Sequence, residues 1–384
     1  MTHRFLITSA PGLERLLADE LSALGIAAAV EPSGAVSAAG DWAVAARILT
    51  RSRIASRVTL SLRRFAARNK AMLYDQVRRV NWPEYFGPDK TLAVTAQGAI
   101  EGTDFVLSYA PLRIKDAVCD EFRKHGLDRP DVDRRDPEVL LNAHFHGGRC
   151  ELSVDLCGAP LHRRGYREEG AAAPLRENRA AALLIYTGYD GSAPLTDPFC
   201  GSGTIPIEGA LIATRTAPGL LRETGEFAAA ALFSESRDPL EAERAAARRE
   251  RLPAPPHPIR GCDISEEVLA TARGNAAKAG VAGHVHFTAG DARSLEYPPG
   301  MVVANPPYGE RLLDETEAAA LVTEFVRRVK HHGVGSTLGL VLPRGRMERA
   351  VGLRPDRRLA VESGSLGLRY SVFTIYAGSR KSRT

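Results

Sequence analysis

The sequence lacks the features that mark membrane, secreted and metal-binding proteins. Its 384 residues contain no run of about 18 apolar residues, so we expect no transmembrane helix. The five cysteines are scattered without a CxxC pair or a Cys/His cluster, which argues against zinc and fits a reducing compartment. The first eight residues are too short and too alternating for a signal peptide. These absences predict a cytoplasmic protein with no membrane anchor and no bound metal.

Acidic residues are nearly absent from one stretch of the chain. Between residues 42 and 80, ten arginines and lysines stand against one acid, Asp75. The net charge of the whole chain is only +5, so this imbalance is local. Charge runs are usually solvated faces, but an excess this large in a segment with structured patterning indicates a surface for a polyanion. Within it, Arg63, Arg64 and Arg68 are the predicted nucleic-acid contacts.

The tetrapeptide Asn305-Pro306-Pro307-Tyr308 follows an apolar run, residues 301–304, that predicts a buried strand. A polar residue at the carboxyl end of such a strand lies where open α/β sheets bind ligands. The Asn305 side-chain oxygen can accept a hydrogen bond from an exocyclic amine. Pro307 keeps Pro306 extended, which can aim the Pro306 carbonyl at the same amine. Tyr308 offers a face on which a base can stack, so the turn predicts a pocket for an aromatic amine facing a methyl donor.

A glycine turn forms the second constellation. Asp197 ends a strand-like run, and Pro198, Gly201 and Gly203 follow before a predicted helix over residues 205–215. The two glycines allow the backbone to approach a ligand closely. The third glycine of the dinucleotide fingerprint is missing, so a glycine pair alone is weak evidence. The acid strengthens it, because Asp197 could accept a hydrogen bond from the amino group of an amino-acid ligand.

Two further strand-like runs end near an acid. Asp263 suits a ribose diol, although it lies farther from the glycines than the usual ~20 residues. Asp291 follows another short strand and could reach an adenine amine. Taken singly, each acid could equally be a helix cap or a turn residue. Taken in this order, they predict a site for S-adenosylmethionine beside the amine pocket. The predicted cofactor-binding residues are Asp197, Pro198, Gly201, Gly203, Asp263, Asp291 and Asn305.

These residues resemble the class I, Rossmann-like amino-methyltransferases. More narrowly, the chain resembles the THUMP-domain RNA guanine-N2 methyltransferases of ribosomal and transfer RNA. The likeness is strong over residues 150–315, weaker before residue 100 and thin after residue 345. The segments that carry the narrower likeness are Leu161-His162-Arg163-Arg164-Gly165-Tyr166-Arg167, Ala173-Pro174-Leu175-Arg176-Glu177-Asn178 and Asn305-Pro306-Pro307-Tyr308-Gly309-Glu310-Arg311-Leu312.

The resemblance implies an α/β protein with three folded parts. A ferredoxin-like domain is expected over residues 1–64 and a THUMP RNA-binding domain over 65–157. A Rossmann-like (class I) methyltransferase domain is expected over 174–378. A basic linker over 158–173 and a disordered tail over 379–384 complete the predicted organisation.

Local patterns agree with this organisation. Apolar spacing predicts a helix over residues 11–24, and Asp41 predicts the cap of a second helix over 42–50. Two alternating runs, 139–145 and 150–156, predict the strands of a hairpin joined by two glycines. Two histidines near its turn have a spacing that could bind metal, but such pairs are more often an ordinary strand face.

The C-terminal half contains one interruption of the strand and helix alternation. Residues 217–258 are rich in Ala, Arg and Glu and then in Pro, which predicts a helical insertion ending in a loop. This insertion explains the long distance from the glycine turn to Asp263. Residues 337–342 and 371–376 predict later strands, and the second is expected at an antiparallel edge.

The resemblance implies methyl transfer from S-adenosylmethionine to guanine N2 in a folded rRNA or tRNA by a monomer. Asn305, Pro306 and Tyr308 would be catalytic, and Arg163 and Arg164 in the linker would add RNA contacts. Adenine-N6 methylation of DNA or RNA stays open, because both bases present an exocyclic amine to the tetrapeptide. A non-catalytic RNA-binding or assembly factor is the alternative from another class. No Pro-Cys pair marks a nucleophile for carbon-5 pyrimidine methylation.

Overall fold

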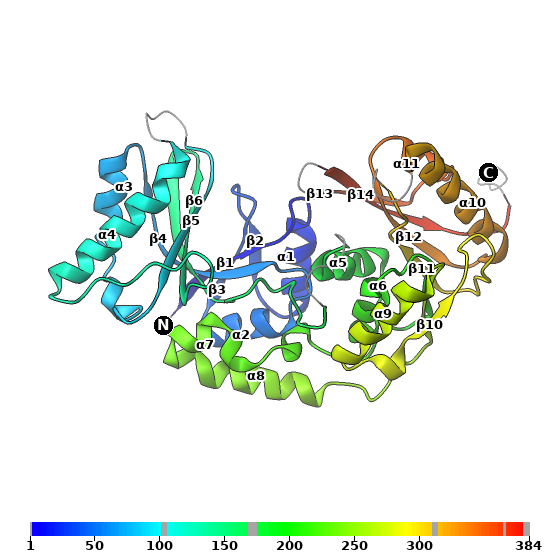
Figure 1. Ribbon diagram of the computed structural model, residues 1–384, viewed down its shortest axis with the longest axis horizontal. Helices are drawn as coiled ribbons and strands as arrows, with labels where there is room; N and C mark the ends of the chain where they lie inside the picture. The colour runs from blue at the N-terminus through cyan, green and yellow to red at the C-terminus, as the bar shows by residue number, and fades with distance from the viewer. Residues whose placement is uncertain (1, 101–105, 168–174, 309–313, 364–365, 379–384) are drawn as a thin grey trace.

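The computed structural model describes residues 2–100, 106–167, 175–308, 314–363 and 366–378. Within these ranges the chain forms two seven-stranded sheets, one from its N-terminal part and one from its C-terminal part (Figure 1). Helices pack on both sheets, so the predicted α/β class is confirmed. No helix in the described ranges is long and apolar enough to cross a membrane.

The N-terminal sheet is continuous across the expected ferredoxin-like and THUMP parts. In spatial order its strands are β2 (Ala28–Val30), β3 (Val36–Gly40), β1 (His3–Thr8), β4 (Arg57–Ala66), β7 (Arg149–Asp155), β6 (Val139–His146) and β5 (Leu92–Gly98). Neighbours are antiparallel except β5 and β6. The long strand β4 joins the two parts, because it pairs with β1 on one side and β7 on the other. The expected boundary after residue 64 falls inside this strand, and the domain limits stay predictions.

Four helices pack on this sheet, and their ends follow local sequence signals. They are α1 (Glu14–Ala23), α2 (Trp42–Arg51), α3 (Lys70–Val77) and α4 (Ala110–Lys124). The Asp41 carboxylate accepts a hydrogen bond from the Ala43 N–H at 3.0 Å and so caps α2. Asn69 caps α3 in the same way, accepting from the Met72 N–H at 2.8 Å. Gly25 follows α1 with a φ of +76°, a conformation that glycine adopts without strain.

The C-terminal sheet has the strand order of a Rossmann-like fold with an antiparallel edge. In spatial order its strands are β10 (His286–Ala289), β9 (Ile259–Asp263), β8 (Leu195–Asp197), β11 (Met301–Ala304), β12 (Thr337–Pro343), β14 (Leu366–Thr374) and β13 (Arg357–Ser363). The first five are parallel to one another, β14 runs antiparallel to both of its neighbours, and β13 therefore has the same direction as the first five. The chain runs outward from β8 to β10 and then returns to β11 on the other side of β8. The junction of β8 and β11 is therefore the topological switch point. The predicted strand at 371–376 falls largely within β14, but the edge is β13, which sequence analysis did not identify.

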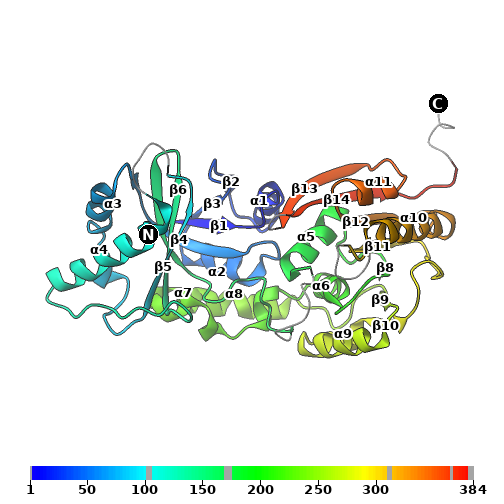
Figure 2. The ribbon, with the colours of Figure 1, turned by 45° about the horizontal axis from the view of Figure 1, so that its top comes forward.

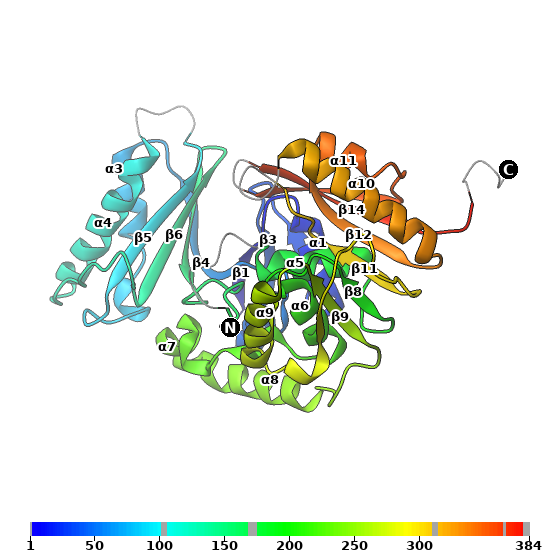
Figure 3. The ribbon, with the colours of Figure 1, turned by 45° about the vertical axis from the view of Figure 1, so that its right-hand side comes forward.

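Helices cover both faces of the C-terminal sheet. On one face lie α5 (Glu177–Thr187), α6 (Thr204–Ala213) and α9 (Glu266–Lys278), and on the other lie α10 (Glu315–His332) and α11 (Arg346–Ala350) (Figure 3). Alternate residues of β11 accordingly enter different cores: Val303 packs with α5 and α6, whereas Val302 and Ala304 pack with α10. The first core also contains buried side chains of the N-terminal sheet, so the two parts share one continuous core.

The insertion between α6 and β9 joins the two parts of the chain. It contains α7 (Ala228–Leu232) and α8 (Arg237–Arg249), and α8 lies along α2 (Figure 2). The rings of Trp42 and Phe233 lie 4.9 Å apart between their centroids. Arg51 of α2 forms an ion pair with Glu243 and donates to Glu250 at 2.8 Å. The helical insertion predicted from composition therefore packs against the N-terminal part.

Candidate active site

Three of the predicted polar residues end neighbouring strands at the switch point. Asp263 and Asp197 are the last residues of β9 and β8, and Asn305 follows β11. These strands are parallel, hydrogen-bonded neighbours, so their carboxyl ends meet at one edge of the sheet. Asp291 lies two residues beyond β10, one strand further out along the same edge. The structure therefore brings together the residues that the sequence argument combined.

The two glycines of the turn serve different physical purposes. Gly201 has a φ of +53°, and a Cβ built on it would meet no atom within 4 Å. Gly203 has a φ of +85°, and its Cβ would lie 3.1 Å from both Ala272 and Phe287. Gly203 thus allows close packing, whereas Gly201 presents bare backbone to open space, which suits the approach of a ligand. The turn leads directly into α6, which begins at Thr204. The first N–H groups of a helix have no partner within the helix and favour an anionic group.

Hydrogen bonds between side chains and the backbone hold this turn in place. Asp263 accepts from the Gly201 N–H at 3.0 Å through one carboxylate oxygen and from the Ser265 N–H at 3.0 Å through the other. Asn275 of α9 donates to the Ser202 carbonyl at 2.9 Å. The end of β9 and the helix that follows it therefore set the shape of the turn. The sequence pattern did not single out Asn275, because a lone polar residue within a helix carries no local signal.

Asp197 is a buried carboxyl group without a cationic partner among the described residues. Its side chain is 1% exposed and accepts a hydrogen bond from the Phe199 N–H at 3.0 Å. Burial raises the pKa of Asp197 to about 8, the hydrogen bond from Phe199 opposes this increase, and the charge of Asp263 adds to it. A buried carboxyl with a raised pKa is stabilised in its ionised form by a cationic ligand group.

Two other polar atoms at this edge are buried and have no hydrogen-bond partner among the described residues. They are the Asn305 side-chain oxygen and the Ser202 hydroxyl. An unsatisfied buried polar group costs about 1–3 kcal/mol, and a ligand that forms the missing hydrogen bond removes that cost. Together with the open space at Gly201 and the lone carboxyl of Asp197, these atoms fit a polar cofactor and an amine donor. The free oxygen of Asn305 agrees with the role expected for this residue.

The remaining residues of the tetrapeptide form a half-buried rim. Pro306 is buried, and the Tyr308 ring packs against both hydrophobic cores of the methyltransferase sheet. Burial raises the pKa of Tyr308, and the charge of Arg179 on α5 opposes this increase. The phenol is therefore neutral and its ring is held from both sides. The remainder of the extended signature, residues 309–312, lies outside the described residues.

Asp291 already has a partner. Arg293 donates to its carboxylate from Nε at 3.0 Å and from a terminal nitrogen at 2.6 Å. These hydrogen bonds lower the pKa of Asp291. An adenine amine would have to share the carboxylate with Arg293, so adenine contact by Asp291 stays a prediction with a competitor that the sequence did not reveal.

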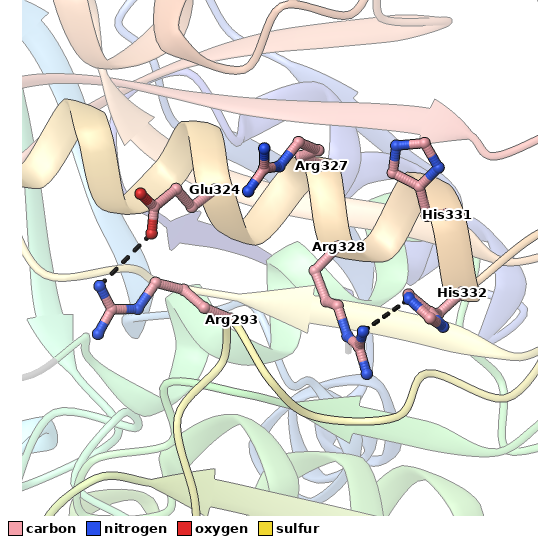
Figure 4. A pocket seen from close by; sticks show the side chains of 6 residues that line it. All are labelled: Arg293, Glu324, Arg327, Arg328, His331 and His332. Carbon is pink, nitrogen blue, oxygen red and sulfur yellow. Dashed lines mark hydrogen bonds and ion pairs between the residues drawn. The ribbon is translucent and has the colours of Figure 1, made fainter.

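A hollow of about 220 Å³ lies beside Arg293, between the loop after β10 and the exposed side of α10 (Figure 4). It is lined by Arg293, Glu324, Arg327, Arg328, His331 and His332. Arg293 lies 3.4 Å from Glu324, and Arg328 lies 2.6 Å from Glu296. These carboxylates pair with two of the three arginines that line the hollow.

Arg164 is buried, and the prediction that it contacts RNA is wrong. Its side chain is 2% exposed and donates to the carbonyls of Leu161 and Arg53, each at 2.6 Å. Its Nε lies 3.5 Å from Glu208 of α6, which also accepts from the Tyr166 hydroxyl at 3.2 Å. A buried guanidinium requires such partners, because its charge cannot be hydrated. The linker signature therefore connects the N-terminal sheet to the helix that follows the glycine turn. Arg163 next to it is exposed, and its RNA contact stays a prediction.

Arg167 in the same signature contacts the start of α6 directly. Its guanidinium donates to the Thr204 hydroxyl and to the Leu175 carbonyl, the latter at 2.6 Å. It also lies 3.7 Å from the Glu177 carboxylate at the start of α5. Arg167 thus connects the starts of α5 and α6. It lies within the signature segment, but nothing in the sequence indicates this positioning role.

Several arginines of the basic stretch hold the protein together. Arg51 and Arg57 form ion pairs with the insertion and with β7, respectively. Arg63 donates to a glutamine of α3 at 3.2 Å. Arg64 and Arg68 are exposed. The excess of ten cations to one acid therefore overstates the charge available to a polyanion, and RNA contact by Arg63, Arg64 and Arg68 stays a prediction.

Among the residues that the structure describes, no group of three or more His, Cys, Asp or Glu side chains could hold a metal ion. All five cysteines are buried free thiols.

Family models match three consecutive parts of the chain. Residues 164–371 match an RMKL-like methyltransferase domain, residues 67–155 a THUMP domain and residues 4–59 an RlmL ferredoxin-like domain. These matches agree with the order of parts expected from the sequence.

Curated relatives carry the name ribosomal RNA large subunit methyltransferase K/L. The chain is 38% identical over 371 residues to the protein of Aliivibrio salmonicida, covering 94% of this chain and 52% of that one. It is 37% identical to the protein of Methylococcus capsulatus, covering 98% and 52% respectively. The chain thus spans about half the length of the curated relatives it matches.

Solved structures share the whole architecture. A methyltransferase in complex with SAH is 25% identical, with a TM-score of 0.87 over 98% of this chain and 99% of that one. A Listeria monocytogenes protein described as an N6-adenine-specific DNA methylase is 28% identical, with a TM-score of 0.84 over 99% and 97%. TrmN from Thermus thermophilus is 25% identical, with a TM-score of 0.70 over 96% and 98%. The chain therefore belongs to the family of RMKL-like methyltransferase domains, here preceded by a ferredoxin-like and a THUMP domain.

Proposed function

We propose that this protein transfers a methyl group from S-adenosylmethionine to the N2 amine of a guanosine in a structured ribosomal or transfer RNA. The observation that carries the proposal is the buried side-chain oxygen of Asn305 at the switch point, which has no hydrogen-bond partner among the described residues. S-adenosylmethionine, when bound, supplies an electrophilic methyl group on a sulfonium. The names of the curated relatives and the SAH complex of a solved relative support this choice of reaction class.

The residues on the β8 and β9 side would hold the cofactor. Asp197 would accept a hydrogen bond from the cationic amino group of the cofactor. This interaction would stabilise the ionised form of a buried carboxyl that has no cationic partner among the described residues. Asp263 would accept from the ribose hydroxyls while it keeps the Gly201 N–H in place. The backbone at Gly201 would lie against the cofactor, because a side chain there would occupy the open space. The Ser202 hydroxyl supplies one more unused polar atom at the same turn.

The residues that follow β11 would hold the base. Asn305 and the Pro306 carbonyl would accept both N–H groups of the amine, which turns its nitrogen lone pair toward the methyl group. Tyr308 would stack on the base, which must leave its helical stack to enter the pocket. Alignment of donor and acceptor and removal of water supply most of the rate enhancement in such a transfer. No covalent enzyme intermediate is needed.

Adenine-N6 methylation is the alternative with a specific observation in its favour. The tetrapeptide accepts any exocyclic amine, and one solved relative is described as an N6-adenine-specific DNA methylase. The THUMP domain and the rRNA methyltransferase names of relatives favour RNA and guanine instead. Guanine presents its amine beside a ring N–H and adenine beside an acceptor nitrogen. A pocket built for one leaves polar groups unpaired with the other.

Nucleoside analysis of the product tests the proposal. The protein is incubated with labelled S-adenosylmethionine and unmodified rRNA or tRNA transcripts, and in parallel with duplex and single-stranded DNA. We expect label in N2-methylguanosine and only in RNA. Label in N6-methyladenosine, or on DNA alone, would support the adenine alternative. Tight cofactor binding by calorimetry without any methylated product would instead support a non-catalytic RNA-binding factor.

A further inference from the structure

The N-terminal sheet has one face that no helix covers in its THUMP half. Residues that pair across adjacent strands lie on the same face. Leu60, Val154 and Leu141 are paired in this way across β4, β7 and β6, and they belong to the core that includes α3 and α4. The residues that alternate with them point the other way. Figures 1 and 3 place α3 and α4 on the side of the sheet away from the methyltransferase part, so the uncovered face is turned toward the rest of the molecule.

The uncovered face is polar from the row of Thr95 to the β6–β7 turn, and beyond Thr95 it continues through the apolar pair Ala93 and Leu140. Its side chains stand in rows across the strands. The rows are Ser61, Ser153, Asn142 and Thr95; then Arg64, Glu151, His144 and Gln97; and finally Arg149 and His146 beside the β6–β7 turn. We refer to these ten residues as the open face. Gln97, His146, Arg149 and Arg64 are exposed, and the side-chain amide nitrogen of Asn142 has no hydrogen-bond partner among the described residues. The open face therefore combines four exposed polar side chains with one buried donor that has no partner among the described residues.

The single acid of the open face is already neutralised. Glu151 accepts from Arg4 at 2.8 Å and binds the Ser61 hydroxyl, and Arg64 lies 3.8 Å from its other oxygen. The side chain of Glu151 is 12% exposed, whereas that of Arg64 is 50% exposed. Arg64 and Arg149 therefore present positive charge to solvent, and the carboxylate between the strands does not.

We propose that the open face is an RNA-binding surface, and this inference rests on the proposed function. Structured RNA is contacted mainly through phosphates and 2′-hydroxyl groups, which pair with arginine, amide, hydroxyl and imidazole groups of the kind found here. The core of a protein interface would need large apolar or aromatic side chains, and the open face has none. An RNA bound to it would run from the THUMP part toward the methyltransferase part, because the face is turned in that direction.

A charge-reversal experiment tests the open face. The variant carries Arg149→Glu together with His146→Ala, two exposed changes beside a surface turn. The matched control is Arg123→Glu on α4, whose side chain is 58% exposed and lies with the covering helices. Binding of a labelled, unmodified large-subunit rRNA transcript is followed by fluorescence anisotropy across a salt series. We expect the open-face variant to bind at least about tenfold more weakly and with a salt slope smaller by about one. The control should match wild type, and all three proteins should bind S-adenosylmethionine equally in calorimetry.

The outcomes separate this inference from the proposed function. Wild-type protein that binds no RNA defeats both. Wild-type protein that binds and methylates RNA, with an open-face variant of unchanged affinity, defeats the inference alone. An equal loss in Arg123→Glu also defeats it, because the effect would then be one of overall charge. Crosslinking with 4-thiouridine RNA gives a second readout: crosslinked peptides from β4, β6 and β7 support the open face, and crosslinks confined to α3 and α4 overturn it.

Discussion

The two sheets of this protein contain seven strands each, but they are covered differently. The C-terminal sheet carries helices on both faces, so only its strand ends are accessible to a ligand. The N-terminal sheet has in its THUMP half a polar face that no helix covers. A sheet with helices on both faces leaves a few polar groups at a buried edge, where water is excluded. A sheet with helices on one face offers many exposed groups on the other, and each of them can make one weak contact.

This difference predicts how strongly single residues matter in each sheet. Asp197 is buried without a cationic partner among the described residues, and the buried side-chain oxygen of Asn305 has no hydrogen-bond partner among them. A ligand interaction at either group is strengthened by the low dielectric surroundings. Arg64 and Arg149 are exposed and are screened by solvent and salt. We therefore expect large effects from substitutions at the strand ends of the C-terminal sheet and small, additive effects from substitutions on the open face.

The largest effect is expected for Asn305→Ala. Loss of a positioned hydrogen bond to the reacting amine should reduce kcat by about 10²-fold or more. Affinity for S-adenosylmethionine should stay near the wild-type value, because Asn305 lies on the base side of the switch point. Single-turnover methylation and calorimetry measure the two quantities separately. Near-normal turnover would remove Asn305 from the reaction and with it the main argument for the site.

A smaller but clear effect is expected for Asp263→Ala. Hydrogen bonds to charged groups contribute about 1.5–3 kcal/mol, so cofactor affinity should fall about tenfold or more. The turn would also lose its bond to the Gly201 N–H. Asp291→Ala is the matched comparison, since Arg293 already occupies that carboxylate on an exposed loop, and we expect a loss below about threefold. Calorimetric titration of the two variants, with folding checked by circular dichroism, measures this difference. Equal losses would mean that the two acids are equivalent in the site.

The raised pKa of Asp197 predicts a pH-dependent cofactor affinity. Below its pKa of about 8 the ligand-free carboxyl is mostly protonated, and a cationic amino group binds its ionised form. Binding at pH 7 should therefore release a proton, and affinity should weaken as pH falls from 7.5 to 5.5. Calorimetry in two buffers of different ionisation enthalpy measures the release. The Asp197→Asn variant should bind the cofactor weakly and release no proton, and an unchanged release would assign the effect to another group.

The same pKa fixes the sign of a stability effect. An aspartate in the unfolded chain has a pKa of about 3.9, so between that value and about 8 the folded protein holds more protons than the unfolded chain. Stability contributed by this group is thus full below pH 4 and is lost as pH rises toward 8. Urea denaturation of ligand-free wild type and Asp197→Asn should differ most near pH 8, with the variant more stable. A variant less stable than wild type at pH 8 would contradict this reading of the site.

Much of the candidate site could be predicted from the sequence because its residues sit at strand ends in a fixed order. The apolar run before Asn305 and the short strand-like stretches before Asp197 and Asp263 predicted strands, and parallel neighbours place their ends together. The topology therefore brings residues that are far apart in the sequence together at one edge of the sheet. The edge strand β13 was missed, because an exposed antiparallel strand with many charged residues has no continuous apolar run.

The roles of charged residues were predicted less well, because a sequence does not reveal partners. Arg164 looked like an RNA contact in a basic linker, but it is buried against Glu208. The available signal was Glu208 itself, a lone acid in the otherwise apolar helix α6, since a buried acid requires a cation nearby. Arg293 beside Asp291 is a similar case, in which an adjacent residue in the sequence takes the predicted ligand contact.

The smallest effect separates two neighbouring arginines on β4 and bears directly on the comparison of the two sheets. Arg64 pairs with Glu151 on the open face, whereas Arg63 pairs with Leu152 on the helix side and donates to Gln76 of α3. If the open face binds phosphates, Arg64→Ala should weaken RNA binding a few-fold and reduce the salt slope by about 0.7–1. Arg63→Ala should leave that slope unchanged, because its guanidinium is used within the fold. Anisotropy titrations over a salt series resolve a slope change of this size. A smaller salt slope for Arg63→Ala and an unchanged slope for Arg64→Ala would place the RNA on the helix side. The open face of the N-terminal sheet would then have no part in RNA binding.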